Sequence, residues 1–266
     1  MSVVPVDREA AQAAIDRLTA KVTADLTNHP AETGRPVPGL DWSVGETGAH
    51  LVTLIDDVTR YVTGDLRPEG SVADMAALNR RRIDRLLDRH GGVLGRLLLE
   101  AVSVFKDVTR DLGGDEPVPW YDPMRIELAI VLSVLVGELS IHGSDIARGL
   151  SLADAIERED ALLVLPAIWE HFPSYLDTEA AAGFTGVFGI AVRGAQPVRI
   201  EIAGGVAAVS PLHGVVDCRI TADPVAFVSV SYGRATPWSQ ILRGKMMATG
   251  SRPWLATRLP QLLIPV

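Results

Sequence analysis

Apolar side chains in the first two thirds of the chain recur at the three- and four-residue spacing of amphipathic helices. In the first such segment, 7–28, they lie four residues apart at Ala14, Leu18, Val22 and Leu26. The pattern predicts helices over 7–28, 43–64, 72–90, 93–112, 123–149 and 152–172. Pro166 is expected to kink or split the last of these, because proline cannot donate a helical hydrogen bond.

Residues that favour helix ends support several of these boundaries. Pro30 follows the first helix, and the residue before a proline avoids helical dihedrals. Ser43 and Glu46 have the spacing of a capping box, in which each side chain bonds the other residue's backbone amide. Pro123 suits a first helical turn, and Gly149 suits a C-terminal cap. The Pro/Gly-rich segment 34–42 is expected to be a loop.

The hydrophobic pattern changes near residue 180. Short β-rich runs at 183–192, 197–203, 206–209 and 215–221 are separated by turn residues, as the strands of a sheet are. Segment 244–249 is expected to be an edge strand, and helices are expected at 225–232, 237–242 and 253–263. The sequence therefore predicts an α+β protein, with a helical bundle over 1–175 and a small α/β domain over 176–266.

Composition and charge exclude one class of partner. The chain has 266 residues, 47% of them hydrophobic, and a net charge of −8. No stripe of Lys and Arg interleaves with aromatic residues, so we expect no nucleic-acid partner. The one dense basic cluster, Arg80–Arg82, lies near Asp84 and Asp88 and is interpreted as a solvated helix face with local ion pairs.

Cysteine content and hydropathy indicate a cytoplasmic protein. The single cysteine, Cys218, excludes an internal disulfide and is interpreted as a small core residue of a strand. The N-terminal residues lack the basic and apolar segments of a signal peptide. The apolar run 128–136 is shorter than the roughly 20 residues that cross a membrane, so no membrane partner is expected.

Charged residues follow this apolar run within the same predicted helix. Glu138 and His142 are four residues apart and share a helix face, with Asp145 one turn further along. Buried carboxylates are rare unless they are paired, hydrogen-bonded or bound to a metal. Together with His50, from the helix over 43–64, they could form a His₂Glu metal site. Such a site leaves one coordination position open, as catalytic zinc sites do.

Local hydrogen bonding is the alternative explanation of these residues. The Glu-x-x-x-His spacing arises by chance, and a histidine against a core often bonds only its neighbours. Glu46 lies one turn before His50, but its capping role already accounts for it, and we leave it out of the ligand set. The remaining histidines fall at predicted element ends or loops and are expected at the surface: His29, His90, His171 and His213.

Two motifs in the first half resemble those of the mycothiol-dependent maleylpyruvate isomerase family. The first is LDWSVGETGAHL at 40–51, and the second is ELSIHGSD at 138–145. In the second half, FVSVSYGR at 227–234 and the Gly-Lys pair at 244–245 resemble the sterol-carrier-like domain of that family. The resemblance covers nearly the whole chain. It departs at Ser144, where family members often have an aromatic residue, which would alter the pocket wall and leave the ligands untouched.

The resemblance implies an N-terminal DinB-like bundle that binds a divalent metal, with zinc expected, through His50, Glu138 and His142. It also implies mycothiol, the thiol of actinobacteria, as the cosubstrate. A metal favours the thiolate, which is the reactive form of a thiol. In the isomerase reaction the thiolate adds to a conjugated double bond, the resulting single bond rotates, and elimination gives the other geometric isomer. Relatives that stop at addition or displacement would be S-transferases.

Two further residues are candidates for catalytic roles. Asp145 could orient a ligand histidine or contact the thiol, or it could be a charge at a helix end. Arg234 could hold a carboxylate substrate with two parallel hydrogen bonds, or it could be a cation at a helix C-terminus. Trp42 is expected to pack at the start of its helix or to line the pocket.

The sequence leaves two classes of function open. The first is a metal-dependent, mycothiol-using isomerase or S-transferase that acts on a small carboxylate-bearing or electrophilic molecule. The second is a carrier of lipid or another apolar ligand without turnover, because the second half resembles sterol-carrier domains. Sites with nitrogen and oxygen ligands accept several divalent metals, so the sequence does not choose among them. The chain is expected to be a monomer or a homodimer.

Overall fold

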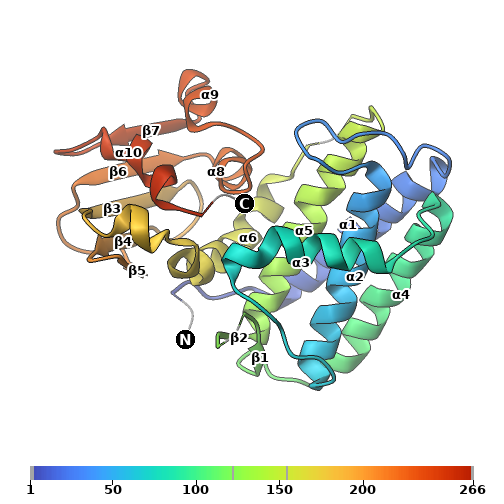
Figure 1. The fold of residues 1–266 in the computed structure, drawn as a ribbon. Coiled ribbons are helices and arrows are strands. Elements are labelled where there is room, and N and C mark those ends of the chain that lie inside the picture. The colour runs from blue at the N-terminus through green and yellow to red at the C-terminus, as the bar shows by residue number, and fades with distance from the viewer. Residues whose placement is uncertain (1–2, 122, 154, 265–266) are drawn as a thin grey trace. The chain divides into compact units, whose positions relative to one another are not determined.

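The computed structural model describes residues 3–121, 123–153 and 155–264, which form two compact units (Figure 1). One unit comprises Asp7–Ile156, and the other comprises Glu157–Val266 with the short segment before Asp7. The first is helical and the second carries a five-stranded sheet, which confirms the predicted α+β class. The division precedes the expected boundary at 175/176, because α6 (Arg158–His171) packs against α8 (Pro224–Ser231) of the sheet-bearing unit.

Four long helices form the bundle of the first unit: α1 (Arg8–Asn28), α2 (Val44–Thr63), α4 (Gly91–Thr109) and α5 (Leu128–Gly149). Each of α1 and α2 packs against both α4 and α5. Among the described helices, α5 alone is long and apolar enough to cross a membrane by length and composition. However, 83% of its most apolar window is buried inside the protein, as in the core helix of a bundle.

A shorter polar helix, α3 (Met75–Arg85), follows the 3₁₀ turn η1 (Val72–Asp74) and packs on α2. It ends five residues before the predicted limit of 90. Arg80 and Arg82 form ion pairs with carboxylates of α2, Glu46 and Asp57 respectively. The expectation of local ion pairs within this segment was therefore wrong for these two arginines, which instead hold α3 against its neighbour.

A small hairpin occupies the expected first turn of α5. Strands β1 (Pro117–Pro119) and β2 (Arg125–Glu127) pair in antiparallel fashion and bury Val118 and Ile126 against the bundle. The helix begins at Leu128 rather than at Pro123, because the preceding residues use their backbone groups in the hairpin.

The second unit is built on a sheet with the strand order β5-β4-β3-β6-β7. Strands β3, β4 and β5 form an antiparallel meander, β6 pairs in parallel with β3, and β7 is antiparallel at the predicted edge. Their bounds are β3 (Thr185–Val192), β4 (Val198–Ala203), β5 (Val206–Pro211), β6 (Cys218–Ala222) and β7 (Met246–Thr249). The prediction of a strand from 215 was too early, because Val215 is 90% exposed and precedes the sheet.

Short helices complete this unit: η2 (Phe172–Tyr175), α7 (Thr178–Ala181), α9 (Pro237–Leu242), α10 (Leu255–Arg258) and η3 (Leu259–Leu262). The predicted helix over 253–263 is thus two short turns, and α6 continues through Pro166 without splitting. His171 was expected at the surface but is buried, and its Nδ1 bonds the carbonyl oxygen of Ala167. Cys218 is buried, as expected.

Candidate metal centre

The start of α2 fixes the position of His50. Ser43 and Glu46 form the predicted capping box: the Ser43 amide donates to Glu46 Oε2 at 2.8 Å, and the Glu46 amide donates to Ser43 Oγ at 3.2 Å. The other carboxylate oxygen of Glu46 accepts from Arg80 at 2.6 Å. Glu46 is therefore engaged at the helix start, while His50 lies one turn later with only 2% of its surface exposed.

Helix α5 presents Glu138 and His142 to the same point. Glu138 Oε2 lies 3.1 Å from His50 Nε2 and 3.5 Å from His142 Nε2. One potential ligand atom from each of the three side chains lies within 4.8 Å of the other two. The bundle thus brings together three residues that are far apart in the sequence, in a buried cluster with a carboxylate between two imidazoles.

Asp145 forms a hydrogen bond with His142 Nδ1, the ring nitrogen that does not face Glu138. Its Oδ2 lies 3.1 Å from His142 Nδ1, and Arg148 contacts its Oδ1. Asp145 is fully buried. A protonated Nδ1 that donates to this carboxylate leaves His142 Nε2 facing Glu138 and His50. Histidines that bind metals usually make such a hydrogen bond through their other nitrogen, because it fixes the ring and its tautomer.

The three side chains shift one another's pKa values. Burial acts to raise the pKa of Glu138, but hydrogen bonds and attraction from His142 and His50 outweigh it and hold the pKa well below its usual range. Burial acts to lower the pKa of His142, yet bonding to Asp145 and Glu138 raises it to about 9. Burial dominates at His50 and lowers its pKa. At neutral pH an ionised Glu138 therefore lies between a protonated His142 and a neutral His50.

The donor set fits a divalent metal ion. Two imidazole nitrogens and one carboxylate oxygen match the ligands that zinc takes in catalytic sites, and related divalent metals accept them too. Within the part of the chain that the structure describes, the group consists of these three side chains, so a bound metal would keep a position for another ligand.

Trp42 combines the two roles that the sequence left open for it. It directly precedes the Ser43 cap of α2, and its ring is half-buried. The centroid of its ring lies 4.9 Å from that of His50 and 5.7 Å from that of His142. Trp42 therefore packs at the helix start and also borders the candidate centre.

Arg234 belongs to the other unit, and the role expected for it stays a prediction. It follows Gly233, whose positive φ of 69° ends the turn after α8. Its Nη1 donates to the carbonyl oxygen of Tyr232 at 2.7 Å, and the side chain is half-buried.

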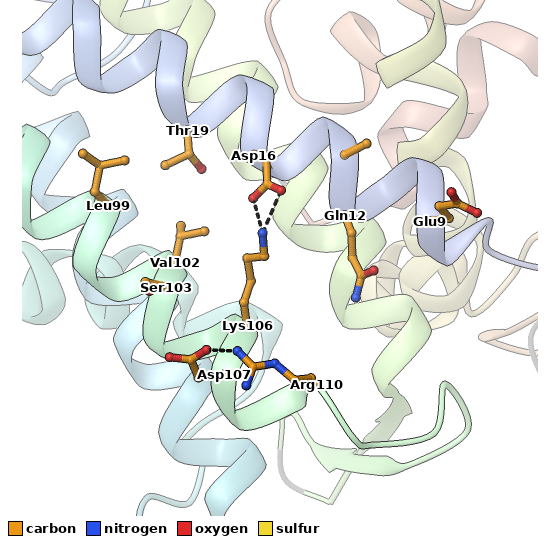
Figure 2. A pocket seen from close by; sticks show the side chains of 11 residues that line it. Glu9, Gln12, Asp16, Thr19, Leu99, Val102, Ser103, Lys106, Asp107 and Arg110 are labelled. Atoms are coloured by element: carbon orange, nitrogen blue, oxygen red, sulfur yellow. Dashed lines mark hydrogen bonds and ion pairs between the residues drawn. The ribbon is translucent and has the colours of Figure 1, made fainter.

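A separate surface groove runs between α1 and α4 (Figure 2). The Lys106 ammonium and the Asp16 carboxylate, 2.6 Å apart, form an ion pair across it. None of the predicted site residues lines this groove, where Asp16 pairs with Lys106 and Asp107 pairs with Arg110 at the surface. It is therefore distinct from the candidate metal centre.

Comparisons with known proteins support the fold described above. A family model described as the mycothiol maleylpyruvate isomerase N-terminal domain matches residues 10–147. A crystal structure of the mycothiol-dependent maleylpyruvate isomerase aligns with 14% identity and a TM-score of 0.57, over 92% of this chain and 93% of that chain. A histidine-to-alanine mutant of that isomerase aligns over the same shares with 13% identity and a TM-score of 0.55. At these identities the similarity shows a common fold.

Sterol Carrier Protein 2 from Yarrowia lipolytica aligns with 13% identity and a TM-score of 0.26, over 38% of this chain and 92% of that chain. No curated protein matches the chain at a significant level.

Proposed function

We propose that this chain, which belongs to the mycothiol maleylpyruvate isomerase N-terminal domain family, is a metal-dependent enzyme that uses a small thiol to attack an electrophilic substrate. The observation that supports the proposal most strongly is the buried cluster of His50, Glu138 and His142. Burying a carboxylate between two imidazoles is costly for a protein that only carries an apolar ligand. It becomes useful when the three side chains bind a cation.

A divalent metal in this cluster would lower the pKa of a bound thiol and so supply a thiolate at neutral pH. The protein's own residues would prepare the site. His50, Glu138 and His142 would hold the metal, with zinc expected. Asp145 would keep the His142 ring in the tautomer that directs Nε2 to the centre.

The family name indicates mycothiol as the thiol and a conjugated small acid as its electrophile. In an isomerisation, the sulfur would bond to one alkene carbon while the electron pair of the double bond moves towards the conjugated carbonyl. Rotation about the new single bond and expulsion of the thiolate would restore the double bond with the other geometry. Arg234 would hold a substrate carboxylate. In a transferase the same attack would be followed by protonation of the carbon next to the carbonyl, and the thioether would then be released.

Metal content measured by mass spectrometry tests this proposal. We expect about one zinc or related divalent ion for each purified chain, and its loss in the double variant Glu138→Ala, His142→Ala. The matched control is His90→Ala, Glu100→Ala, which removes the same residue types from exposed positions and should keep the metal. Wild-type protein with metal would then be assayed with mycothiol and maleylpyruvate, both for isomerisation and for thioether formation.

Wild-type protein that takes up no metal even when zinc is supplied would contradict the proposal, and an apolar-ligand carrier would become the better hypothesis. Metal that remains in the double variant would place the binding site elsewhere. If the protein binds metal but does not convert maleylpyruvate, the proposed metal centre would still hold, and maleylpyruvate would be excluded as the substrate.

A further inference from the structure

The loop between α1 and α2 follows a defined path. We call residues 30–42 the strap. Its tip is a turn in which the Leu40 amide donates to the Val37 carbonyl at 3.1 Å. Pro38 and Gly39 occupy the two central positions, and Gly39 has a φ of 84°. Proline followed by a residue with positive φ is the signature of a type II turn. The turn folds the strap back, so that the Val37 amide donates to the Trp42 carbonyl at 2.9 Å.

The strap is bonded to the start of α2. The Gly45 amide donates to the Thr33 carbonyl at 2.7 Å, and the Val44 amide donates to the Arg35 carbonyl at 2.9 Å. These bonds use amides in the first turn of α2, which have no partner within their own helix. The strap and the helix that carries His50 are therefore held in register by the backbone.

Arg35 also ties the strap to the end of α5. Its Nη2 donates to Ser151 Oγ at 2.7 Å, and its Nη1 donates to the Leu150 carbonyl at 3.3 Å. Ser151 has a φ of 61°, a left-handed conformation that is uncommon for a residue other than glycine. The hydroxyl that such a residue supplies is thus placed at some conformational cost, which points to a role for the contact.

Gly149 allows the strap to approach α5 closely. A Cβ atom at this position would lie 2.5 Å from Val44 Cγ2 and 3.3 Å from Val37 Cγ2, and the first of these is a clash. The sequence suggested that Gly149 is a C-terminal cap, but the cap is Leu150 and Gly149 is the last helical residue. Its missing side chain therefore allows both the start of α2 and the strap to pack closely against α5.

The two imidazoles of the candidate centre are supported differently. His142 Nδ1 bonds Asp145, whereas His50 Nδ1 is buried and has no hydrogen-bond partner among the described residues. The Trp42 ring packs against His50 at 4.9 Å between centroids, with the ring planes tilted by 43°. Glu138 bonds the other nitrogen of His50, so on the Nδ1 side the orientation of the ring depends on packing, to which the Trp42 ring contributes.

We propose that Trp42 is a positioning residue of the metal centre: the strap, tied to α5 by Arg35, packs the indole against His50 and so holds a ring whose Nδ1 has no hydrogen-bonded support among the described residues. This inference rests on the proposed metal centre. It assigns the strap a purpose beyond connecting two helices. It also explains why the arginine, the glycine and the left-handed serine that fix the strap meet at the end of α5, the helix that carries the other two ligands.

Cobalt binding by metal-free protein tests this role. The visible absorption of Co²⁺ reports its affinity, and quenching of tryptophan fluorescence reports how close an indole lies to the ion. We expect Trp42→Leu to weaken Co²⁺ binding about tenfold, as loss of an aromatic contact predicts, and Trp42→Phe to restore it to within about threefold. Arg35→Met should weaken binding in the same direction by about threefold, because it releases the strap.

The fluorescence readout separates positioning from general stability. Trp42→Phe should abolish most of the quenching by bound Co²⁺, while Trp238→Phe, which changes an exposed tryptophan of the other unit, should leave it unchanged. If Trp42→Leu fails to fold, Arg35→Met and the quenching in Trp42→Phe still decide the question.

Wild-type affinity in both Trp42→Leu and Arg35→Met, or full quenching in Trp42→Phe, would overturn the positioning role alone. Wild-type protein that binds no Co²⁺ at all would instead overturn the metal centre itself, and the positioning role with it.

Discussion

Two carboxylates in the bundle, the partly buried Glu138 and the buried Asp57, have opposite kinds of partners. Glu138 lies between the imidazoles of His50 and His142. Asp57, which is 3% exposed, lies between two guanidinium groups of α3, at 2.9 Å from Arg82 and 2.8 Å from Arg85. Arginine keeps its charge at any accessible pH, whereas imidazole can become neutral and donate a lone pair.

This difference separates a structural cluster from a candidate functional one. The Asp57 cluster pairs its negative charge with two cations: Arg82 also donates to the Tyr61 hydroxyl at 3.1 Å, and neither guanidinium can bind a cation. The Glu138 cluster offers a negative charge and two imidazoles, each of which can bind a cation through a nitrogen that carries no proton. A buried charge therefore suggests a site only when its partners can exchange their protons for another ligand.

The largest effect that this comparison predicts is on the free energy of unfolding. We expect Asp57→Asn to lower the free energy of unfolding of the metal-free protein by about 3 kcal/mol, because it leaves buried guanidinium charge uncompensated. Glu138→Gln should lower it less, by about 2 kcal/mol, since Gln still accepts a hydrogen bond and both imidazoles, unlike the guanidinium groups, can give up a proton when the charge of Glu138 is removed. Chemical denaturation of the two variants at pH 7 measures both values. Equal losses would mean that Glu138 is also mainly structural.

The comparison also shows where sequence reasoning succeeded. The spacing of Glu138 and His142 placed them on one face of α5, and the capping box placed His50 on the second helix of the bundle. Such local relations follow from helix geometry alone. The pairing of Asp57 with Arg82 does not, because it depends on how α3 crosses α2, and the residues between them do not encode that crossing.

Other errors have the same origin in tertiary contacts. Pro123 is compatible with a helix start, but the β1–β2 hairpin takes up that segment and delays α5 to Leu128. Gly149 has the composition of a cap, yet its use lies in the close approach of Val37 and Val44. Segment 34–42 signalled only a loop, because its anchors at Val44, Leu150 and Ser151 lie in other elements.

A smaller effect, on zinc affinity, is expected at Asp145, which bonds the His142 nitrogen that points away from Glu138. Asp145→Asn should weaken zinc binding about 10- to 100-fold, because the ligand His142 loses the anionic acceptor that orients its ring and strengthens its lone pair. Isothermal titration with zinc measures this change. Asp57→Asn is the control and should leave zinc affinity unchanged, provided that the titration is run where this variant is folded. Unchanged affinity in Asp145→Asn would reduce Asp145 to a charge at the helix end.

The smallest effect is expected at Glu46, a third carboxylate on the same helix as Asp57, which is only partly buried. Burial acts to raise its pKa, but hydrogen bonds from Ser43 and Arg80 outweigh this and hold the pKa below its ordinary value of 4.5. A carboxyl group whose pKa is lower in the folded state stabilises the fold above its unfolded pKa. This contribution is lost as the pH falls through the folded value.

Glu46→Gln should therefore cost about 1 kcal/mol of unfolding free energy at pH 7, the usual scale of a helix-start interaction. The difference from wild type should shrink as the pH falls from about 5 towards 3, because a protonated carboxyl group and a glutamine amide interact similarly with Ser43 and Arg80. Urea denaturation across this pH range measures the difference. A gap that stays constant with pH would show that Glu46 acts through packing of its side chain, and that α2 owes its start to Ser43 alone.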